Sequence, residues 1–308
     1  MLTRFFSHSK PIAFIIIGIS FTVAFFIENF LSSSVEVSAS YLIKKTGLFF
    51  VFLFIIFLLN FMVKRNKIHK SNTYAVSIFV FLSIAFPELL RSSEFILSYL
   101  FLLLSMRKIL SLKTNKNVKQ KIFDSGFLLM ISVFFDPFHL LFLIFIYFGV
   151  IMYASQNYRH FIIPLFGISV AFVIYTSFIL IVENSFLDPF IYLPRFDGVE
   201  NLFTNFKYSF LLSLPLLFLL WIIIQFPKIY SRSKLHVSES LSLVLVFLIV
   251  SLAVLLLNEA SISVDIIYLI FPLSILIGNY FQLNSTKKWL KEVFYAVMLS
   301  SIVFSAIY

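Results

Sequence analysis

The sequence predicts an all-α polytopic membrane protein, a bundle of about eleven transmembrane helices with a cytoplasmic N-terminus and an extracytoplasmic C-terminus. The first observation is composition: of the 308 residues 61% are hydrophobic and 12% are charged, and the mean hydropathy is +1.02. Such a chain is too hydrophobic to surround one core with a polar surface. The other two observations are regularly recurring apolar runs and an alternation of positive charge between them. The whole chain, 1–308, is predicted to form a single transmembrane domain.

Apolar runs of roughly 17–25 residues are long enough to cross a bilayer as helices, and shorter runs suffice where neighbouring helices shield them. The first run follows a basic start, is about 20 residues long and lacks a small-residue cleavage site, so we expect it to be a retained span and not a signal peptide. The predicted spans are 11–30, 43–63, 73–89, 95–111, 122–135, 138–155, 161–182, 208–227, 240–257, 263–281 and 290–307.

The basic residues predict the orientation of these spans, because cytoplasmic loops keep an excess of Lys and Arg. With the N-terminus inside, 19 of the 24 basic residues lie in cytoplasmic segments and 11 of the 14 acidic residues lie outside. An error of one span would disturb this alternation at every later loop. The net charge of +10 is therefore explained by topology, and a nucleic-acid partner is not expected. The most basic run, 107–121, could also touch anionic lipid headgroups.

Acidic residues are concentrated outside, so any proton-transfer or sugar chemistry is expected at the outer membrane surface. The first outer loop carries Glu28 and Glu36, with serines that can cap the following helix. A solvated loop explains these residues equally well. The loop "NEASISVD" after the ninth span reads as a solvated turn with no role beyond topology.

The second outer turn, "AFPELLRSSEFIL", places Glu88, Arg91 and Glu94 at intervals of three, which would put them on one helical face. Arg91 could bind a phosphate group while the two glutamates orient it. The alternative is a polar turn that begins at Pro87. The longest outer loop, 183–207, contains Arg195 among aromatic residues, which suggests either an interfacial belt or the lip of a substrate groove.

The stretch "FFDPFHL" holds Asp136 and His139 between two apolar spans. Asp136 can cap the following helix and Pro137 suits its first position, so a helix–turn–helix reversal explains the stretch. We expect His139 in the first helical turn, where water or a neighbouring loop would satisfy its imidazole. A catalytic Asp136–His139 pair is the alternative.

Several function classes lack their sequence signals. The chain has no cysteine, which excludes thiol redox chemistry and zinc–thiolate sites. It has no glycine-rich phosphate loop, nucleophile elbow or metal-ligand spacing, so no metal site is predicted and any cofactor is unknown. Few charges lie deep within spans, which disfavours a secondary transporter, although transport of a lipid or small molecule stays open.

From residue 70 to about 182, the order of features resembles the polytopic glycosyltransferases with the C-type fold. The run "NTYAVSIFVFLSIAFPELLRSSEFILSYLFLLLSMRKIL" is similar to their short hairpin, and "IFDSGFLLMISVFF", "DPFHL" and "NYRHFIIPLFGISVAFVIY" continue the pattern. The resemblance implies transfer of sugars from polyprenyl-phosphate lipids outside the inner membrane. It also implies that Glu28 or Glu36 is the general base and that Arg91 contacts the lipid phosphate. The family's extended, acidic first outer loop and large outer domain are absent from this pattern.

The chain also resembles multispan bacterial envelope proteins with no assigned activity, so whether it is an enzyme stays open. The alternative is a noncatalytic inner-membrane scaffold or assembly subunit of a cell-envelope complex. The expected partners are membrane lipids, including a polyprenyl-phosphate lipid, and a membrane-protein partner under the second hypothesis. Both hypotheses place the protein in the bacterial inner membrane as a multi-pass protein.

Overall fold

A computed structural model of the chain describes residues 2–7, 9–31, 38–69, 72–183, 206–257, 262–282 and 287–307. In these ranges the chain forms helices and no strands, as the sequence predicts for an all-α protein. The contacts divide the chain into two compact units: unit 1 is 1–93, 199–248 and 260–308, and unit 2 is 94–198 and 249–259. The prediction of one transmembrane domain stays a prediction.

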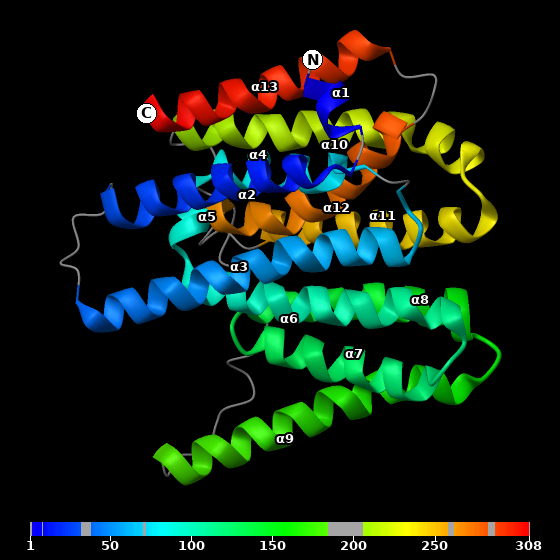
Figure 1. The fold of residues 1–308 in the computed structure, drawn as a ribbon. Coiled ribbons are helices and arrows are strands. Elements are labelled where there is room, and N and C mark those ends of the chain that lie inside the picture. Colours follow the sequence, from blue (N-terminus) through cyan, green and yellow to red (C-terminus); the bar gives the residue numbers. More distant parts are fainter. Residues whose placement is uncertain are drawn as a thin grey trace. The chain divides into compact units, whose positions relative to one another are not determined.

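Helices occupy all eleven segments that hydropathy singles out (Figure 1). In unit 1 they are α1 (Leu2–Phe6), α2 (Pro11–Phe26), η1 (Ile27–Leu31), α3 (Ala39–Arg65), α4 (Tyr74–Ile84), α5 (Pro87–Arg91), α10 (Phe206–Arg232), α12 (Ile262–Gln282) and α13 (Lys288–Ile307), with most of α11 (Leu235–Leu257). In unit 2 they are α6 (Ser93–Leu110), η2 (Ser111–Thr114), α7 (Val118–Val133), η3 (Pro137–Phe142), α8 (Leu143–Ala154), η4 (Tyr158–Phe161) and α9 (Ile163–Glu183).

Among the described residues, nine helical segments are long and apolar enough to cross a membrane. The protein is therefore a multi-pass membrane protein by its helices. One predicted span, 73–89, is divided in the structure: α4 has 11 residues before the chain leaves the helix at Ala85 and Phe86, and α5 follows from Pro87. The exact number of crossings stays a prediction.

The core of unit 1 is built around α12, in which residues 265–281 are all buried. This helix packs against α4, α5 and α10, and an edge-to-face contact between Phe79 and Phe271 joins α4 to it at 5.9 Å between ring centroids. Gly278 allows α12 to approach α4 and the loop before it closely, because a Cβ there would lie 3.1 Å from the Ala75 backbone nitrogen and 2.5 Å from Cε1 of His69.

In unit 2, α7 and α9 lie side by side along their lengths (Figure 1). Two glycines allow the contact: a Cβ on Gly126 would lie 2.2 Å from the Pro164 carbonyl oxygen, and a Cβ on Gly167 would lie 2.3 Å from that of Phe123. Close packing on small residues is a common means of helix association in membranes. Glycine is rare in this sequence, yet it lies where these two helices touch.

Side-chain contacts within unit 1 join loops that the sequence assigns to the same membrane side. Thr3 Oγ1 donates to Glu292 Oε1 at 2.6 Å, and Asn279 Nδ2 donates to the Ile68 carbonyl oxygen at 2.7 Å. All four residues belong to ends predicted to be cytoplasmic. Two chain positions on the same side of a membrane are separated by an even number of membrane crossings. The predicted topology places an even number of spans between Thr3 and Glu292 and between Ile68 and Asn279, so these contacts agree with it. Which side faces the cytoplasm stays a prediction.

Candidate functional site

The end of unit 1 that the sequence predicts to be extracytoplasmic gathers polar residues from three separate segments, here called the Arg91 cluster: Glu28 and Asn29 on η1, Lys45 on α3 and Arg91 on α5. The Arg91 guanidinium is 2.6 Å from Glu28 Oε1, and the side chains are 47% and 14% exposed. The guanidinium is therefore about half-exposed, whereas the carboxylate is largely covered.

Local structure explains why these side chains meet. The last turn after α2 is π-helical, a wider turn that is often found at functional sites. In this turn Asn29 is fully buried, and its Nδ2 donates to the carbonyl oxygens of Phe25 at 3.0 Å and Leu90 at 3.1 Å. Asn29 of this turn therefore binds the C-terminal end of α5, and Glu28 of the same turn binds Arg91, the last residue of that helix.

Lys45 completes the attachment of α5. Its Nζ donates to the Arg91 carbonyl oxygen at 2.8 Å, which places a cation at the negative end of that short helix. The cations of Lys44 and Arg91 lie close enough to act on the Lys45 ammonium. Three of the five basic residues predicted to lie outside are thus concentrated here, with Glu28 offsetting one charge.

The spacing argument for Glu88, Arg91 and Glu94 is correct only in part. Pro87 begins α5, as the sequence predicts, and Glu88 and Arg91 share this helix. The prediction that all three share one face is wrong, because Ser92 has extended ψ (106°) and breaks the helix before α6 begins at Ser93. Glu94 therefore belongs to a different helix.

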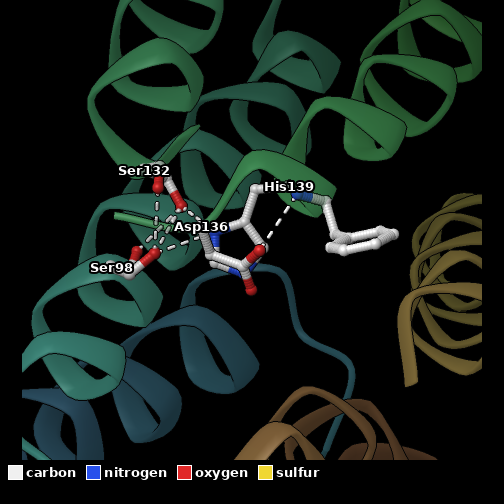
Figure 2. Close-up of polar contacts among 5 residues, drawn as sticks. Ser98, Ser132, Asp136 and His139 are labelled. Atoms are coloured by element: carbon white, nitrogen blue, oxygen red, sulfur yellow. Dashed lines mark hydrogen bonds and ion pairs between the residues drawn. The ribbon is translucent and has the colours of Figure 1, made fainter. Parts of the chain in front are cut away.

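The second polar group, here called the His139 cluster, lies in unit 2 and comprises Ser98, Ser132, Asp136 and His139 (Figure 2). His139 Nδ1 is 2.8 Å from Ser98 Oγ and 2.5 Å from Ser132 Oγ, and its Nε2 is 3.5 Å from Asp136 Oδ2. The serines are on α6 and α7, and His139 is on η3. All four residues are buried.

The hydroxyl groups also link the two helices directly. Ser98 Oγ is 3.0 Å from the Ser132 carbonyl oxygen, and Ser132 Oγ is 3.0 Å from the Ser98 carbonyl oxygen. Each hydroxyl has one proton, so both cannot donate to a carbonyl and to Nδ1 at once. With a neutral imidazole protonated at Nε2, one hydroxyl donates to Nδ1, the other donates to a carbonyl, and Nε2–H faces the Asp136 carboxylate.

These contacts favour the structural interpretation of "FFDPFHL" over the catalytic one. Asp136 is the N-cap of η3, its Oδ1 accepts from Phe138 N at 3.0 Å, and Pro137 occupies the first position, so the predicted helix reversal is confirmed. The expectation that water or a loop satisfies His139 is wrong, because the ring is 0% exposed and binds serines of two helices. The hydropathy pattern does not indicate that Ser98 and Ser132 bind His139, because serines are common within apolar spans.

Other sequence expectations meet different outcomes. Ser38 caps α3 through a hydrogen bond from Tyr41 N at 3.2 Å, as predicted. The reading of "NEASISVD" as a solvated turn is wrong for Asp265, which is fully buried in the first turn of α12.

Glu36, Arg195 and nearly all of the loop 183–207 lie outside the described residues. In the described ranges, no group of three or more His, Asp or Glu side chains could hold a metal ion.

Comparisons with known proteins assign a family and no activity. No curated protein and no solved structure matches the chain. One family model matches residues 1–308, the full length of the sequence, and it is described as a family of unknown function, DUF6427. The chain therefore belongs to this family of unknown function, as a multi-pass membrane protein.

Proposed function

We propose that this protein binds the phosphate group of a lipid-linked substrate at the extracytoplasmic face of the bacterial inner membrane, in the manner of the polyprenyl-phosphate-dependent glycosyltransferases. The observation that carries the proposal is the Arg91 cluster, in which Glu28 of η1 contacts the half-exposed guanidinium and Lys45 of α3 donates to the backbone carbonyl oxygen of the same arginine. Arg91 and Glu28 are the residues that the family resemblance pairs with substrate.

The chemistry of the cluster suits a phosphate group. A guanidinium has five N–H donors, so its contact with one carboxylate oxygen leaves donor capacity for an anion. Lys45 and the nearby Lys44 add positive charge. A polyprenyl phosphate would place its headgroup at this end of the helices and its chain in the surrounding lipid.

Glu28 fits a positioning role better than that of a general base. Glu28 Oε1 is already in contact with the Arg91 guanidinium at 2.6 Å, whereas a general base must lie within hydrogen-bond reach of the proton that it removes from an acceptor. The carboxylate instead fixes the direction of the guanidinium. If sugar transfer occurs here, the general base that activates the acceptor must then be a different residue.

The binding step is tested on purified protein in a neutral detergent by native mass spectrometry with a polyprenyl phosphate. Arg91→Gln is expected to weaken binding about tenfold, the usual effect of losing a charge-assisted contact, while Arg159→Gln on the opposite predicted side should leave it unchanged. Glu28→Gln removes the competing negative charge but loosens Arg91, so a change smaller than that of Arg91→Gln is expected. Equal binding by wild type and Arg91→Gln would contradict the proposal.

The transfer step is tested separately, by comparing lipid-linked glycan intermediates between a deletion strain and its parent. Accumulation of a precursor in the deletion strain, relieved by wild type and not by Arg91→Gln, is the expected result. Unchanged intermediates would exclude transfer. Lipid binding with no effect on glycans would instead favour a noncatalytic assembly subunit, the alternative that the ion-paired state of Glu28 supports.

A further inference from the structure

Unit 2 contains a further polar site, at the opposite end of α6 and α7 from the His139 cluster. The last two turns of α6 and the middle of α7 line an open cavity of about 310 Å³, at the small end of the range for ligand sites. It is lined by Leu104, Arg107, Lys108, Asp124, Phe127 and Leu128. Three of these side chains are charged and three are apolar, so the cavity has a charged part and an apolar part.

The charged part of the cavity is positive on balance. Lys108 Nζ is 2.6 Å from Asp124 Oδ2, and this pair is neutral as a whole. Arg107 is a second cation of the lining, so cations outnumber acids there by two to one. Lys121 lies near Lys108, and its ammonium donates to the Ser111 carbonyl oxygen at 2.6 Å and to Thr114 Oγ1 at 2.7 Å.

The connection between the two helices is held tightly beside this site. Asn115 and Asn117 both have left-handed backbone conformation, with φ of 51°, and asparagine tolerates this conformation better than most residues. Lys121 binds the η2 segment directly. The ammonium of Lys121, beside the cavity, is therefore positioned by the fold.

The apolar wall lies on the side of the cavity that continues into the spans. Leu104 is one turn before Arg107 on α6, and Phe127 and Leu128 are one turn after Asp124 on α7. The cavity thus changes from cationic to apolar along the helix direction, as does a phospholipid from headgroup to acyl chain. Basic pockets between transmembrane helices on the cytoplasmic side are known sites for anionic headgroups.

We propose that this cavity binds an anionic phospholipid of the leaflet predicted to be cytoplasmic, with its phosphate at Arg107 and Lys108 and its acyl chain along Leu104, Phe127 and Leu128. This site is independent of the Arg91 cluster, which belongs to unit 1. The Lys108–Asp124 ion pair sets the affinity, because the carboxylate competes with the lipid phosphate for the same ammonium. Removal of the acid and removal of the arginine should therefore change binding in opposite directions.

The experiment uses the full-length protein in neutral detergent, titrated with phosphatidylglycerol and, separately, with phosphatidylcholine, and reads bound lipid by native mass spectrometry. Wild type is expected to prefer phosphatidylglycerol. Arg107→Gln should weaken that binding about fivefold, the usual contribution of one basic residue near a membrane surface, whereas Asp124→Asn should strengthen it. Lys116→Gln removes one charge from the same basic segment at an exposed position outside the lining and should have no effect.

Two further arms make the result decisive. Leu128→Trp fills the apolar part of the cavity without changing its charge and should reduce lipid binding. A thermal unfolding transition measured in the presence of phosphatidylcholine shows that this variant is folded. Inorganic phosphate at matched concentration should neither bind nor displace the lipid. Equal losses in Arg107→Gln and Lys116→Gln, equal binding of the two lipids, or displacement by inorganic phosphate would each overturn the proposal.

Discussion

At the residue scale, several buried polar side chains in the described part of the chain fix one helix against another. Asn29 binds the end of α5, and Ser98 and Ser132 exchange contacts with each other's backbone around His139. A polar group buried away from water costs free energy unless it is hydrogen-bonded, so each such group specifies a particular neighbour. His69, in the loop after α3, is another example, since its Nε2 lies 2.8 Å from the Ile275 carbonyl oxygen.

His69 predicts a pH dependence of stability. Burial lowers the pKa of His69 from 6.5 to about 4, and the hydrogen bond to Ile275 opposes this only in part. Because the folded state binds its proton less readily than the unfolded state, stability is complete above about pH 6.5 and falls as pH drops towards 4. The loss from this group between pH 7.5 and 5 is about 2 kcal/mol.

The measurement is unfolding of the detergent-solubilised protein at both pH values, for wild type and for His69→Gln. Glutamine retains an N–H donor for the Ile275 carbonyl and does not titrate in this range. The variant should therefore lose most of the pH-dependent change. An identical pH dependence in both proteins would show that other groups cause it.

At the element scale, the α7–α9 pair depends on backbone approach more than on large side chains. Much of α9 is exposed apolar surface, including Phe166, Val173 and Phe178, as expected of a helix that faces lipid. Since lipid is as apolar as these side chains, their burial provides little drive for association. The glycine contacts with α7 are therefore the specific part of this interface.

Gly126→Ala and Gly167→Ala should each destabilise the protein by about 1–3 kcal/mol, because the added methyl would overlap backbone of the facing helix. The double variant should cost less than the sum, since one separation of α7 and α9 relieves both overlaps. Gly18→Ala and Gly47→Ala are the controls, with no heavy atom within 4 Å of the new Cβ. Comparable losses in the controls would mean that glycine flexibility, and not close packing, is responsible.

At the scale of the whole molecule, the charge distribution and the contacts of unit 1 agree on which chain ends share a side. The Glu28–Arg91 pair joins two turns predicted outside, and the contact of Thr3 with Glu292 joins two ends predicted inside. The predicted number of membrane crossings can therefore be tested by labelling residues on either face of the membrane.

The absence of native cysteine makes this test direct. Ser40→Cys and Lys116→Cys introduce thiols at exposed positions predicted to lie outside and inside. In right-side-out membrane vesicles, an impermeant maleimide should label the Ser40→Cys variant at once and the Lys116→Cys variant only after permeabilisation. Labelling of both variants before permeabilisation would contradict the predicted topology.

The sequence by itself determined the class of the protein and the position of its helices, because a hydrocarbon environment demands long apolar segments whose backbone groups bond internally. It also identified the cap at Asp136 and Pro137 and the start of α5 at Pro87, since capping depends on a few adjacent residues. These features are local, and local rules are sufficient to find them.

Only the tertiary structure decided which polar residues meet. Glu28 and Arg91 are far apart in the sequence, and the serines that bind His139 are uncharged members of apolar helices, so periodicity and charge give no indication of either contact. The burial of Asp265 and the glycine approaches at Gly126 and Gly167 likewise depend on which helix faces them. Helix formation in a membrane is settled within each segment, whereas the pairing of segments depends on shape and hydrogen bonding between surfaces that are equally apolar in sequence.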